Sequence, residues 1–383
     1  MKVLLLNASH NDLGLIRGLK KLGFYIVVTG NTPGLVGEQY CDKYIRADYS
    51  DKELILKISK EEKIDRICAC CNDFGVYTAS YVAEKLGLPG YDPDETTCAI
   101  NNKDKFKKLT EELGIISPKT RSFTDIEKAK SFIDSMGSED YPLIIKPSDA
   151  SAGNGITKVN DRSEAYEAVS YAFDTCRNGT IVIEQYIEGT QHGFCTFLVD
   201  KKVRAICSNN EYSIINPYRV EIDTFPADNW EEASKILIPE IEKIADRLNL
   251  IDGIFHLQYI MSDGKPYIIE AMQRAIGNMY SVLADRLNGI EWDYWEAKAK
   301  CGISCKDFPV SPEQKGFFAY KSVMADSNGR IDKITIPEEY GEFLFDKCMI
   351  RDVGDEITNY RSQMIGLLFF EFPSKEKMKE VLI

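Results

Sequence analysis

The chain of 383 residues is longer than one compact core usually supports, so we expect two or three domains. Hydrophobic residues make up 44% and charged residues 28%, as in globular proteins that fold in water. The net charge of −13 argues against nucleic-acid and membrane partners, because no overall basic field is present. No apolar run reaches the roughly 20 residues that cross a bilayer, and Val3–Leu6 is too short for a signal peptide, so we expect a cytoplasmic protein.

The cysteines do not form a metal-binding pattern. There are 11 of them, an odd number, and only three histidines accompany them. A zinc site would need spaced cysteine pairs with further cysteine or histidine ligands. We therefore expect free thiols, most of them buried.

The first 98 residues alternate between strand and helix patterns. Strand-like runs occupy residues 2–7, 25–29 and 66–71, and helical spacing occupies residues 13–22, 52–62 and 77–86. This alternation predicts a parallel sheet covered by helices on both faces. The loop at 7–12 follows the first strand, where such sheets bind ligands, but it lacks the G-x-G-x-x-G pattern of nicotinamide-cofactor sites. In this loop His10 and Asp12 are candidates for substrate contact, and capping of the next helix by Asn11 or Asp12 is the favoured alternative.

Two lysines stand where an anion would bind. Lys103 opens a predicted helix that runs to Leu113, and it is the lysine of the 103–108 group that we expect to face a cleft, the others forming a solvated face. Lys146 ends the apolar strand 141–146, where a lysine is costly unless it meets an anion. The loop at 147–155 that follows consists of small residues, whose backbone N–H groups approach anions closely. It is not a Walker loop, because a strand follows it.

Residues 253–278 read as a hairpin that turns at Asp263-Gly264. Counting outward from the turn places Gln258 close to opposite Glu270, with Arg274 just beyond. An amide oxygen, a carboxylate and a guanidinium together suit Mg²⁺ with a phosphate beside it. A surface hairpin with scattered polar residues is the alternative.

The remaining patterns are simpler. We expect a strand at 181–187 that carries Glu184, a hairpin from 192–199 and 203–208, an amphipathic helix at 231–248 and a helical run at 280–300. The tail predicts strands near 316–324, 331–336 and 364–372 and a final helix at 375–382.

Taken in order, these motifs resemble the ATP-grasp superfamily, closest to the branch that includes carbamoyl-phosphate synthetase, biotin carboxylase and the carboxylate–amine ligases. The resemblance covers about residues 1–300. It implies an α/β and α+β fold with a parallel α/β (pre-ATP-grasp) domain at 1–98, a two-subdomain ATP-grasp domain at 99–300 and a small α+β segment at 301–383. Within the ATP-grasp domain, residues 112–187 would form the nucleotide lid and residues 188–300 the metal and catalytic subdomain.

The resemblance also implies ATP and Mg²⁺, with Mn²⁺ as an alternative metal, and it assigns roles to residues. Gln258 and Glu270 would hold the metal, and Arg274 would steady the transferred phosphoryl group, with Lys146 as the other catalytic residue. The nucleotide would contact Lys103, Lys146, Ser151, Ala152, Gly153, Gly155, Glu184, Gln185, Tyr186, Ile187 and Gln191. Of these, the lysines and the 151–155 loop would contact phosphates, Glu184 and the hinge 185–187 would read the adenine, and Gln191 is the nearest candidate for the ribose.

Three positions depart from the family pattern. Met272 stands where an oxygen ligand is expected; either Gln273 replaces it after a small shift or one metal is held more weakly. Gln258 replaces a glutamate, which lowers the charge of the metal site. Gln191 stands where the family often has the ribose-binding glutamate.

The function that this resemblance implies is a ligase that phosphorylates a carboxylate and joins it to an amine. The alternatives are a carboxylate or carbamate kinase-like phosphoryl transfer and a catalytically silent nucleotide-binding module. An amino acid or a sugar acid is the expected carboxylate, and a homodimer is left open. Tyr218-Arg219 is a candidate carboxylate anchor, with a surface arginine as the equal alternative.

Overall fold

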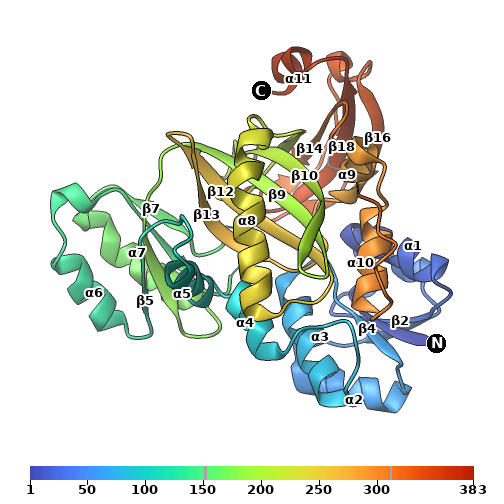
Figure 1. Ribbon diagram of the computed structural model, residues 1–383. Coiled ribbons are helices and arrows are strands. Elements are labelled where there is room, and N and C mark those ends of the chain that lie inside the picture. The colour runs from blue at the N-terminus through green and yellow to red at the C-terminus, as the bar shows by residue number, and fades with distance from the viewer. Residues whose placement is uncertain (151–152, 311–312) are drawn as a thin grey trace.

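The computed structural model describes residues 1–150, 153–310 and 313–383. The fold has three parts: an N-terminal domain, a small lid and a large antiparallel sheet (Figure 1). No helix in these residues is both long and apolar enough to cross a bilayer.

The N-terminal domain confirms the predicted parallel sheet. Its strand order is β3-β2-β1-β4, and every pairing is parallel. The strands are β1 (Lys2–Leu6), β2 (Tyr25–Gly30), β3 (Lys43–Arg46) and β4 (Arg66–Cys68), and the helices are α1 (Leu13–Lys21), α2 (Lys52–Glu62) and α3 (Asp73–Leu86). Strand β4 is shorter and α3 begins earlier than the pattern predicts, because Asn72 caps α3 by accepting a hydrogen bond from the Phe74 N–H.

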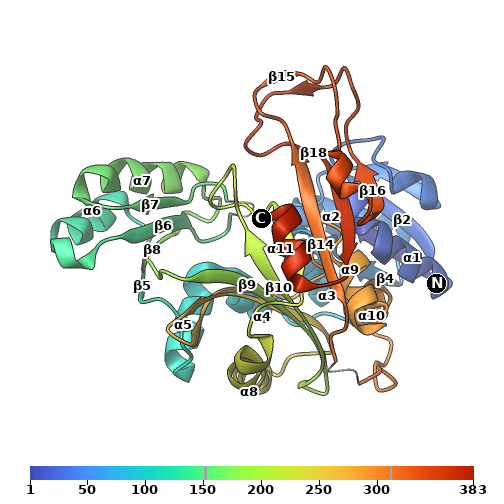
Figure 2. The ribbon, with the colours of Figure 1, turned by 90° about the horizontal axis from the view of Figure 1, so that it is seen from above.

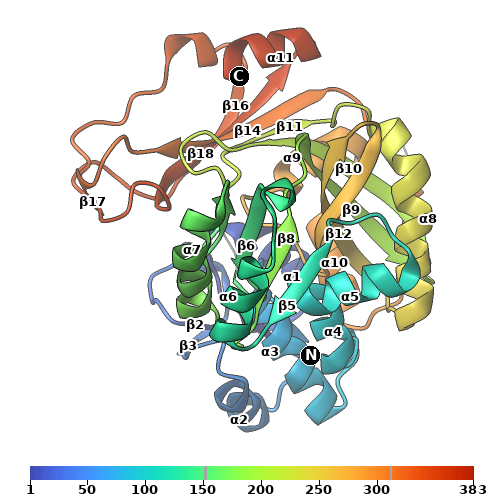
Figure 3. The ribbon, with the colours of Figure 1, turned by 90° about the vertical axis from the view of Figure 1, so that its left-hand side faces the viewer.

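The lid is a four-stranded antiparallel sheet of order β5-β8-β6-β7. Its strands are β5 (Thr120–Phe123), β6 (Leu143–Pro147), β7 (Thr157–Val159) and β8 (Ile181–Gln185), and its helices are α6 (Ile126–Asp134) and α7 (Arg162–Thr175). Both helices pack on the sheet through one apolar cluster and stand apart from the large sheet (Figures 1 and 2), and Figure 3 views the lid from its outer side. The helices α4 (Asp94–Asn101) and α5 (Lys103–Leu113) lead into the lid.

The large sheet has eight strands in the order β13-β12-β9-β10-β11-β14-β18-β16, and every pairing is antiparallel. Its strands are β9 (Thr190–Val199), β10 (Lys202–Tyr212), β11 (Ile222–Phe225), β12 (Gly253–Ser262), β13 (Lys265–Met272), β14 (Phe317–Met324), β16 (Leu344–Met349) and β18 (Met364–Phe372). The predicted hairpin is confirmed, and Gln258 pairs with Glu270. The tail strands extend the same sheet across residue 300.

Two details of the tail differ from expectation. The predicted strand at 331–336 is irregular, and the local pair is instead β15 (Gly329–Arg330) with β17 (Glu356–Ile357). The final helix α11 (Lys375–Leu382) matches the prediction.

Helices cover both faces of the large sheet. Alternate residues of β9 point to opposite faces: Phe194 and Leu198 pack with α8 (Trp230–Leu248), whereas Cys195 and Phe197 pack with α9 (Ser281–Asn288) and α10 (Trp292–Lys300). The predicted helical run at 280–300 is therefore two helices, because Gly289 ends α9 in the left-handed conformation.

Two glycines let the N-terminal domain approach the large sheet. Gly14 and Gly18 lie four residues apart on α1, on the face that packs against α10 (Figure 2). A Cβ at Gly18 would lie 2.9 Å from the Tyr294 Cα, closer than side-chain packing allows. The sequence of α1 thus sets the distance between the two domains that border the pocket.

We expect Gly18→Leu to lower the free energy of unfolding by about 1–3 kcal/mol, because the added side chain would push against the α10 backbone. Thermal unfolding followed by circular dichroism measures the change. Lys20→Leu on the exposed face of the same helix is the matched control and should change stability by less than about 0.5 kcal/mol. Equal stability of both variants would contradict the close helix contact.

Candidate active site

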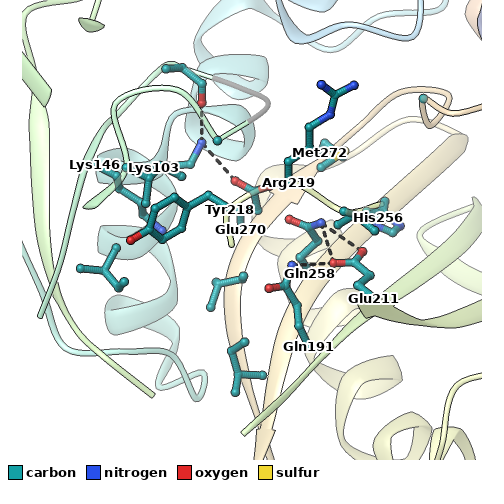
Figure 4. Close-up of a pocket in the computed structure, with 18 of the residues that line it drawn as sticks. Lys103, Lys146, Gln191, Glu211, Tyr218, Arg219, His256, Gln258, Glu270 and Met272 are labelled. Carbon is teal, nitrogen blue, oxygen red and sulfur yellow. Dashed lines mark hydrogen bonds and ion pairs between the residues drawn. The ribbon is translucent and has the colours of Figure 1, made fainter. Parts of the chain in front are cut away.

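A pocket of about 510 Å³ lies where the lid, the large sheet and the N-terminal domain meet, which is a volume typical of small-molecule sites (Figure 4). The described residues on its walls include predicted site residues from all regions of the resemblance. These are Lys103, Lys146, Gly153, Glu184, Gln185, Tyr186, Ile187, Gln191, Gln258, Glu270 and Arg274. Ser151 and Ala152 lie outside the described residues. Gly155 is not among the lining residues and packs against Pro147.

The floor of the pocket is one face of the large sheet. Along each strand, the residues on this face change from apolar core residues to polar residues that line the pocket. On β10, Ala205 and Cys207 belong to the apolar core under α9 and α10, and Glu211 further along the same face lines the pocket. On β12, Ile254 is core and Gln258 lines the pocket. On each of these strands, residues that point to the same face are core residues at one end and pocket-lining residues at the other.

Lys103 lies against the hairpin, as its position in the first turn of α5 predicts. Its Nζ is 3.1 Å from Glu270 Oε2 and donates to the Ala150 carbonyl at 3.0 Å. Burial opposes both charges, but the pair outweighs it: Glu270 raises the pKa of Lys103, and Lys103 lowers the pKa of Glu270. A phosphate and a cation would meet opposite charges here already in place.

Lys146 pairs with Glu184 inside the lid. Its Nζ is 2.7 Å from Glu184 Oε2, and Lys107 Nζ is 3.6 Å from Glu184 Oε1. The solvated position predicted for Lys107 is wrong: the side chain is 4% exposed and donates to the Ile268 carbonyl. Burial lowers the pKa of Lys107 to about 8. Its spacing of four residues from Lys103 was the available signal, because both lie on one helix face.

The predicted metal residues adjoin an acid that the sequence analysis missed. Gln258 Nε2 donates to both oxygens of Glu211, at 3.0 and 2.9 Å, and Gln191 Nε2 donates to the same carboxylate at 2.6 Å (Figure 4). Burial raises the pKa of Glu211 to about 7. Gln191, the ribose candidate, is thus tied to Glu211.

The replacement of Met272 by Gln273 as a ligand is ruled out by position. Met272 lines the pocket, opposite His256 in the neighbouring strand. Gln273 is buried, and its Nε2 donates to Asp92 Oδ2 at 2.7 Å, away from the lining residues. The position facing the pocket therefore carries a thioether, which is a poor ligand for a hard cation.

Arg274 joins the hairpin to the N-terminal domain. Its Nε is 2.6 Å from Asp73 Oδ1, at the start of α3, and its Nη1 donates to the Ala275 carbonyl. Asp73 also lines the pocket and was not predicted. The two bonds orient the guanidinium on the pocket wall.

The segment before β11 forms another wall. Tyr218 and Arg219 both line the pocket, and Arg219 is partly buried. Burial lowers the pKa of Arg219. The Tyr218 hydroxyl accepts a hydrogen bond from the Lys158 N–H at 2.6 Å, and a Cβ at Gly153 would lie 2.6 Å from the Tyr218 carbonyl. This segment therefore packs closely on the loop that follows Lys146.

Two backbone N–H groups of the predicted hinge already donate hydrogen bonds to carbonyl groups of the protein. The N–H of Gln185 donates to the Lys119 carbonyl at 2.9 Å, and the N–H of Tyr186 donates to the Pro142 carbonyl at 3.2 Å. These two donors hold the lid strands together.

The loop after β1 has a structural role that differs from the predicted capping of α1. Neither His10 nor Asp12 lines the pocket, and Asp12 makes no side-chain cap bond to α1. The buried Asp12 carboxylate instead accepts from the N–H groups of Ser9 and Cys71, both at 2.8 Å, and Asn11 Oδ1 accepts from the Met279 N–H. The loop is thereby fastened to its neighbours.

Comparison of the sequence with known proteins finds one family match and several distant relatives. The family model for the phosphoribosylglycinamide synthetase ATP-grasp (A) domain matches residues 101–217. The carbamoyl phosphate synthase large chain of Clostridium botulinum is 24% identical over 275 residues, which cover 70% of this chain and 25% of that protein. The C-terminal section of the large chain from Methanocaldococcus jannaschii is 22% identical, covering 70% of this chain and 44% of that protein. The chain thus spans between a quarter and less than half of these relatives.

Solved structures match almost the whole chain. An L-amino acid ligase from Bacillus licheniformis superposes with a TM-score of 0.82 at 18% identity, covering 99% of this chain and 95% of the other. Phosphoribosylglycinamide synthetase from Anaerococcus prevotii gives 0.75 at 18% identity, covering 99% and 96%. The biotin carboxylase domain of 2-oxoglutarate carboxylase from Hydrogenobacter thermophilus, solved with MgADP and bicarbonate, gives 0.77 at 20% identity, covering 100% and 89%. Residues 101–217 thus match an ATP-grasp domain, and the fold of almost the whole chain is similar to the folds of these solved structures.

Proposed function

We propose that the protein is an ATP-dependent ligase that converts a carboxylate to an acyl phosphate and joins it to an amine, releasing ADP and phosphate. The observation that carries the proposal is the convergence of Lys103, Lys146, Glu270 and Arg274 on one pocket. Phosphoryl transfer requires mainly positioning and charge neutralisation, and these side chains supply both.

The residues present fit a magnesium nucleotide. Lys103 and Lys146 offer cations for the phosphates, and the lid residues Gln185–Ile187 line the part of the pocket suited to a base. Glu270 and Gln258 offer oxygens to the metal from paired strands. When bound, Mg²⁺ would neutralise the phosphate charge, and Mn²⁺ would serve the same purpose.

The chemistry divides into two displacements. A carboxylate oxygen attacks the γ-phosphorus, and the bond to the bridging oxygen breaks, giving ADP and an acyl phosphate. The amine nitrogen then attacks the carbonyl carbon, phosphate leaves with the bonding electrons, and the nitrogen loses a proton. Arg274, oriented by Asp73, lies on the wall where it would neutralise the transferred phosphoryl group. Closure of the lid would exclude water from the acyl phosphate.

The neighbours support small-molecule substrates. One is an L-amino acid ligase, and another is named for a phosphoribosylglycinamide product. An amino acid or a sugar acid is accordingly the proposed carboxylate. A homodimer is the proposed assembly, since the biotin carboxylase domain named above was solved as a dimer. We propose action in the cytoplasm without a nucleic-acid or membrane partner.

The nucleotide product tests this function directly. With ATP, Mg²⁺ and a panel of carboxylates, we expect ADP release that depends on an added amine, measured by a coupled assay and by chromatography of the nucleotides. ADP without amine dependence would favour the kinase-like reaction. AMP with pyrophosphate would refute an acyl phosphate, and binding without turnover on a broad panel would favour the silent module, which Met272 keeps open.

The assigned charges predict which variants lose activity. Glu270→Ala and Lys146→Ala should each reduce ADP formation by at least about 10³-fold, because each removes a preorganised charge at the transferred group. Lys108→Ala, whose side chain is 78% exposed on α5, is the matched control and should keep wild-type activity. Full activity of either site variant would overturn the assignment.

For Met272, we predict a substitution that strengthens Mg²⁺ binding. Met272→Asn places an oxygen where the pocket now has a thioether, so we expect the Mg²⁺ concentration for half-maximal ADP formation to fall several-fold. Met272→Leu has a similar volume and no oxygen, and it should behave as the wild type. An unchanged Mg²⁺ requirement in Met272→Asn would show that position 272 does not face the metal.

A further inference from the structure

The pocket extends along the sheet beyond the proposed metal residues. Glu211 on β10 pairs with Asp223 on β11, and Asp223 pairs with Tyr320 on β14, so the three side chains form a row on one face. All three line the pocket. Asp223 is four strands from Glu270 in the sheet order, so the two carboxylates occupy different parts of the pocket floor.

Asp223 is a buried carboxylate with an unused oxygen. The residue is 4% exposed, and it forms no ion pair with a lysine or arginine of the described chain. Tyr320 and Asn209 lie beside the carboxylate, yet its Oδ1 atom accepts no hydrogen bond from the described residues. The Tyr280 hydroxyl donates to Asn209 Oδ1, and Asn278 donates to the Tyr320 hydroxyl, while Asn209 Nδ2 has no partner in the described chain.

Burying a carboxylate with an unpartnered oxygen lowers the stability of the folded protein. A buried charge without a partner costs free energy that a cation or a hydrogen-bond donor recovers. Burial, and then the nearby Glu211 carboxyl, raise the pKa of Asp223 well above its usual range, so a cation bound beside Asp223 would favour its ionised form. The described residues contain no group of three His, Cys, Asp or Glu side chains placed to hold a metal ion. An organic cation with N–H donors therefore matches the Asp223 end better than a bare ion does.

Arg219 lines the same pocket from the segment before β11 and carries a positive charge. It forms no ion pair with any carboxylate of the described residues, including Asp223 four positions along the chain. Among the described residues, the pocket thus presents a guanidinium without an ion-pair partner and a carboxyl group whose Oδ1 atom accepts no hydrogen bond. A molecule that carries a carboxylate and an ammonium group complements both.

We propose that the end of the pocket formed by Asp223 and Tyr320 binds the protonated amino group of a substrate, with Asp223 as the acceptor and Arg219 facing the substrate carboxylate. The inference rests on the proposed ligase function and names an amino acid as its substrate class. Asp223 then determines specificity, selecting substrates by their ammonium group.

The experiment measures binding and turnover separately. Thermal-shift titrations in the presence of MgADP compare matched probes: L-phenylalanine, 3-phenylpropionate and phenethylamine; L-glutamate, glutarate and 4-aminobutanoate; and the remaining standard L-amino acids. We expect an amino acid to stabilise the wild type where its partner without the amino group does not. Asp223→Asn should weaken that binding about 10- to 100-fold, as expected for loss of a charged hydrogen bond, and leave MgADP binding unchanged.

The controls separate binding from folding. Asp223→Asn keeps the side-chain volume and removes a buried charge, so the unliganded variant should melt at or above the wild-type temperature. Asp346→Asn removes one exposed charge from β16 of the same sheet and should bind every probe as the wild type does.

Several results would overturn the inference. They are preference for probes without an amino group, absence of binding by any amino-bearing probe, wild-type binding by Asp223→Asn, or stabilisation by Mg²⁺ alone that Asp223→Asn abolishes. Amino-acid binding without ADP release would leave the subsite standing and refute the ligase function. ADP release with acids that lack an amino group would do the reverse.

Discussion

Charges buried in a protein interior need partners of opposite sign, and around this pocket each such pair also connects two parts of the chain. Lys146 meets Glu184 within the lid, and Lys103 on α5 meets Glu270 on the hairpin. Arg274 on the far side of the hairpin meets Asp73 in the N-terminal domain. The arrangement of the three parts therefore depends on a few ion pairs. If a nucleotide bound here, its phosphates would take the place of the carboxylates that now contact the lysines. A metal cation would take the place of the lysine that now contacts Glu270.

Much of this site is predictable because its signals are local. The Asp263-Gly264 turn sets a hairpin register that places Gln258 close to Glu270, and a β-bulge between Gln258 and Tyr259 brings the two directly opposite. Lys146 is conspicuous because it follows a run of buried strand residues, and Lys103 because it stands in the first turn of a helix. Each inference needed only neighbours in sequence and one periodicity. The parallel N-terminal sheet follows in the same way from alternating strands and helices.

The missed residues are those whose importance arises from tertiary contacts. Asp73 matters because Arg274 reaches it from 201 positions along the chain. Gln273 has the right chemistry for a ligand, but the strand direction turns it toward Asp92. The tail strands have recognisable patterns, yet nothing local shows that β14 pairs with β11 and so completes the floor of the pocket. Strand pairing over such separations is a property of the whole fold.

The departures from the family pattern at Gln258 and Met272 both affect the charge and the oxygen donors on the pocket floor. Gln258 and Met272 remove negative charge and an oxygen donor from the metal end of the sheet. Glu211 adjoins Gln258, and Asp223 lies one strand further along the same face. Acidic groups therefore continue along the sheet face from the proposed metal residues toward Tyr320. The proposed metal site and the proposed amino-group site would accordingly depend on one set of neighbouring side chains.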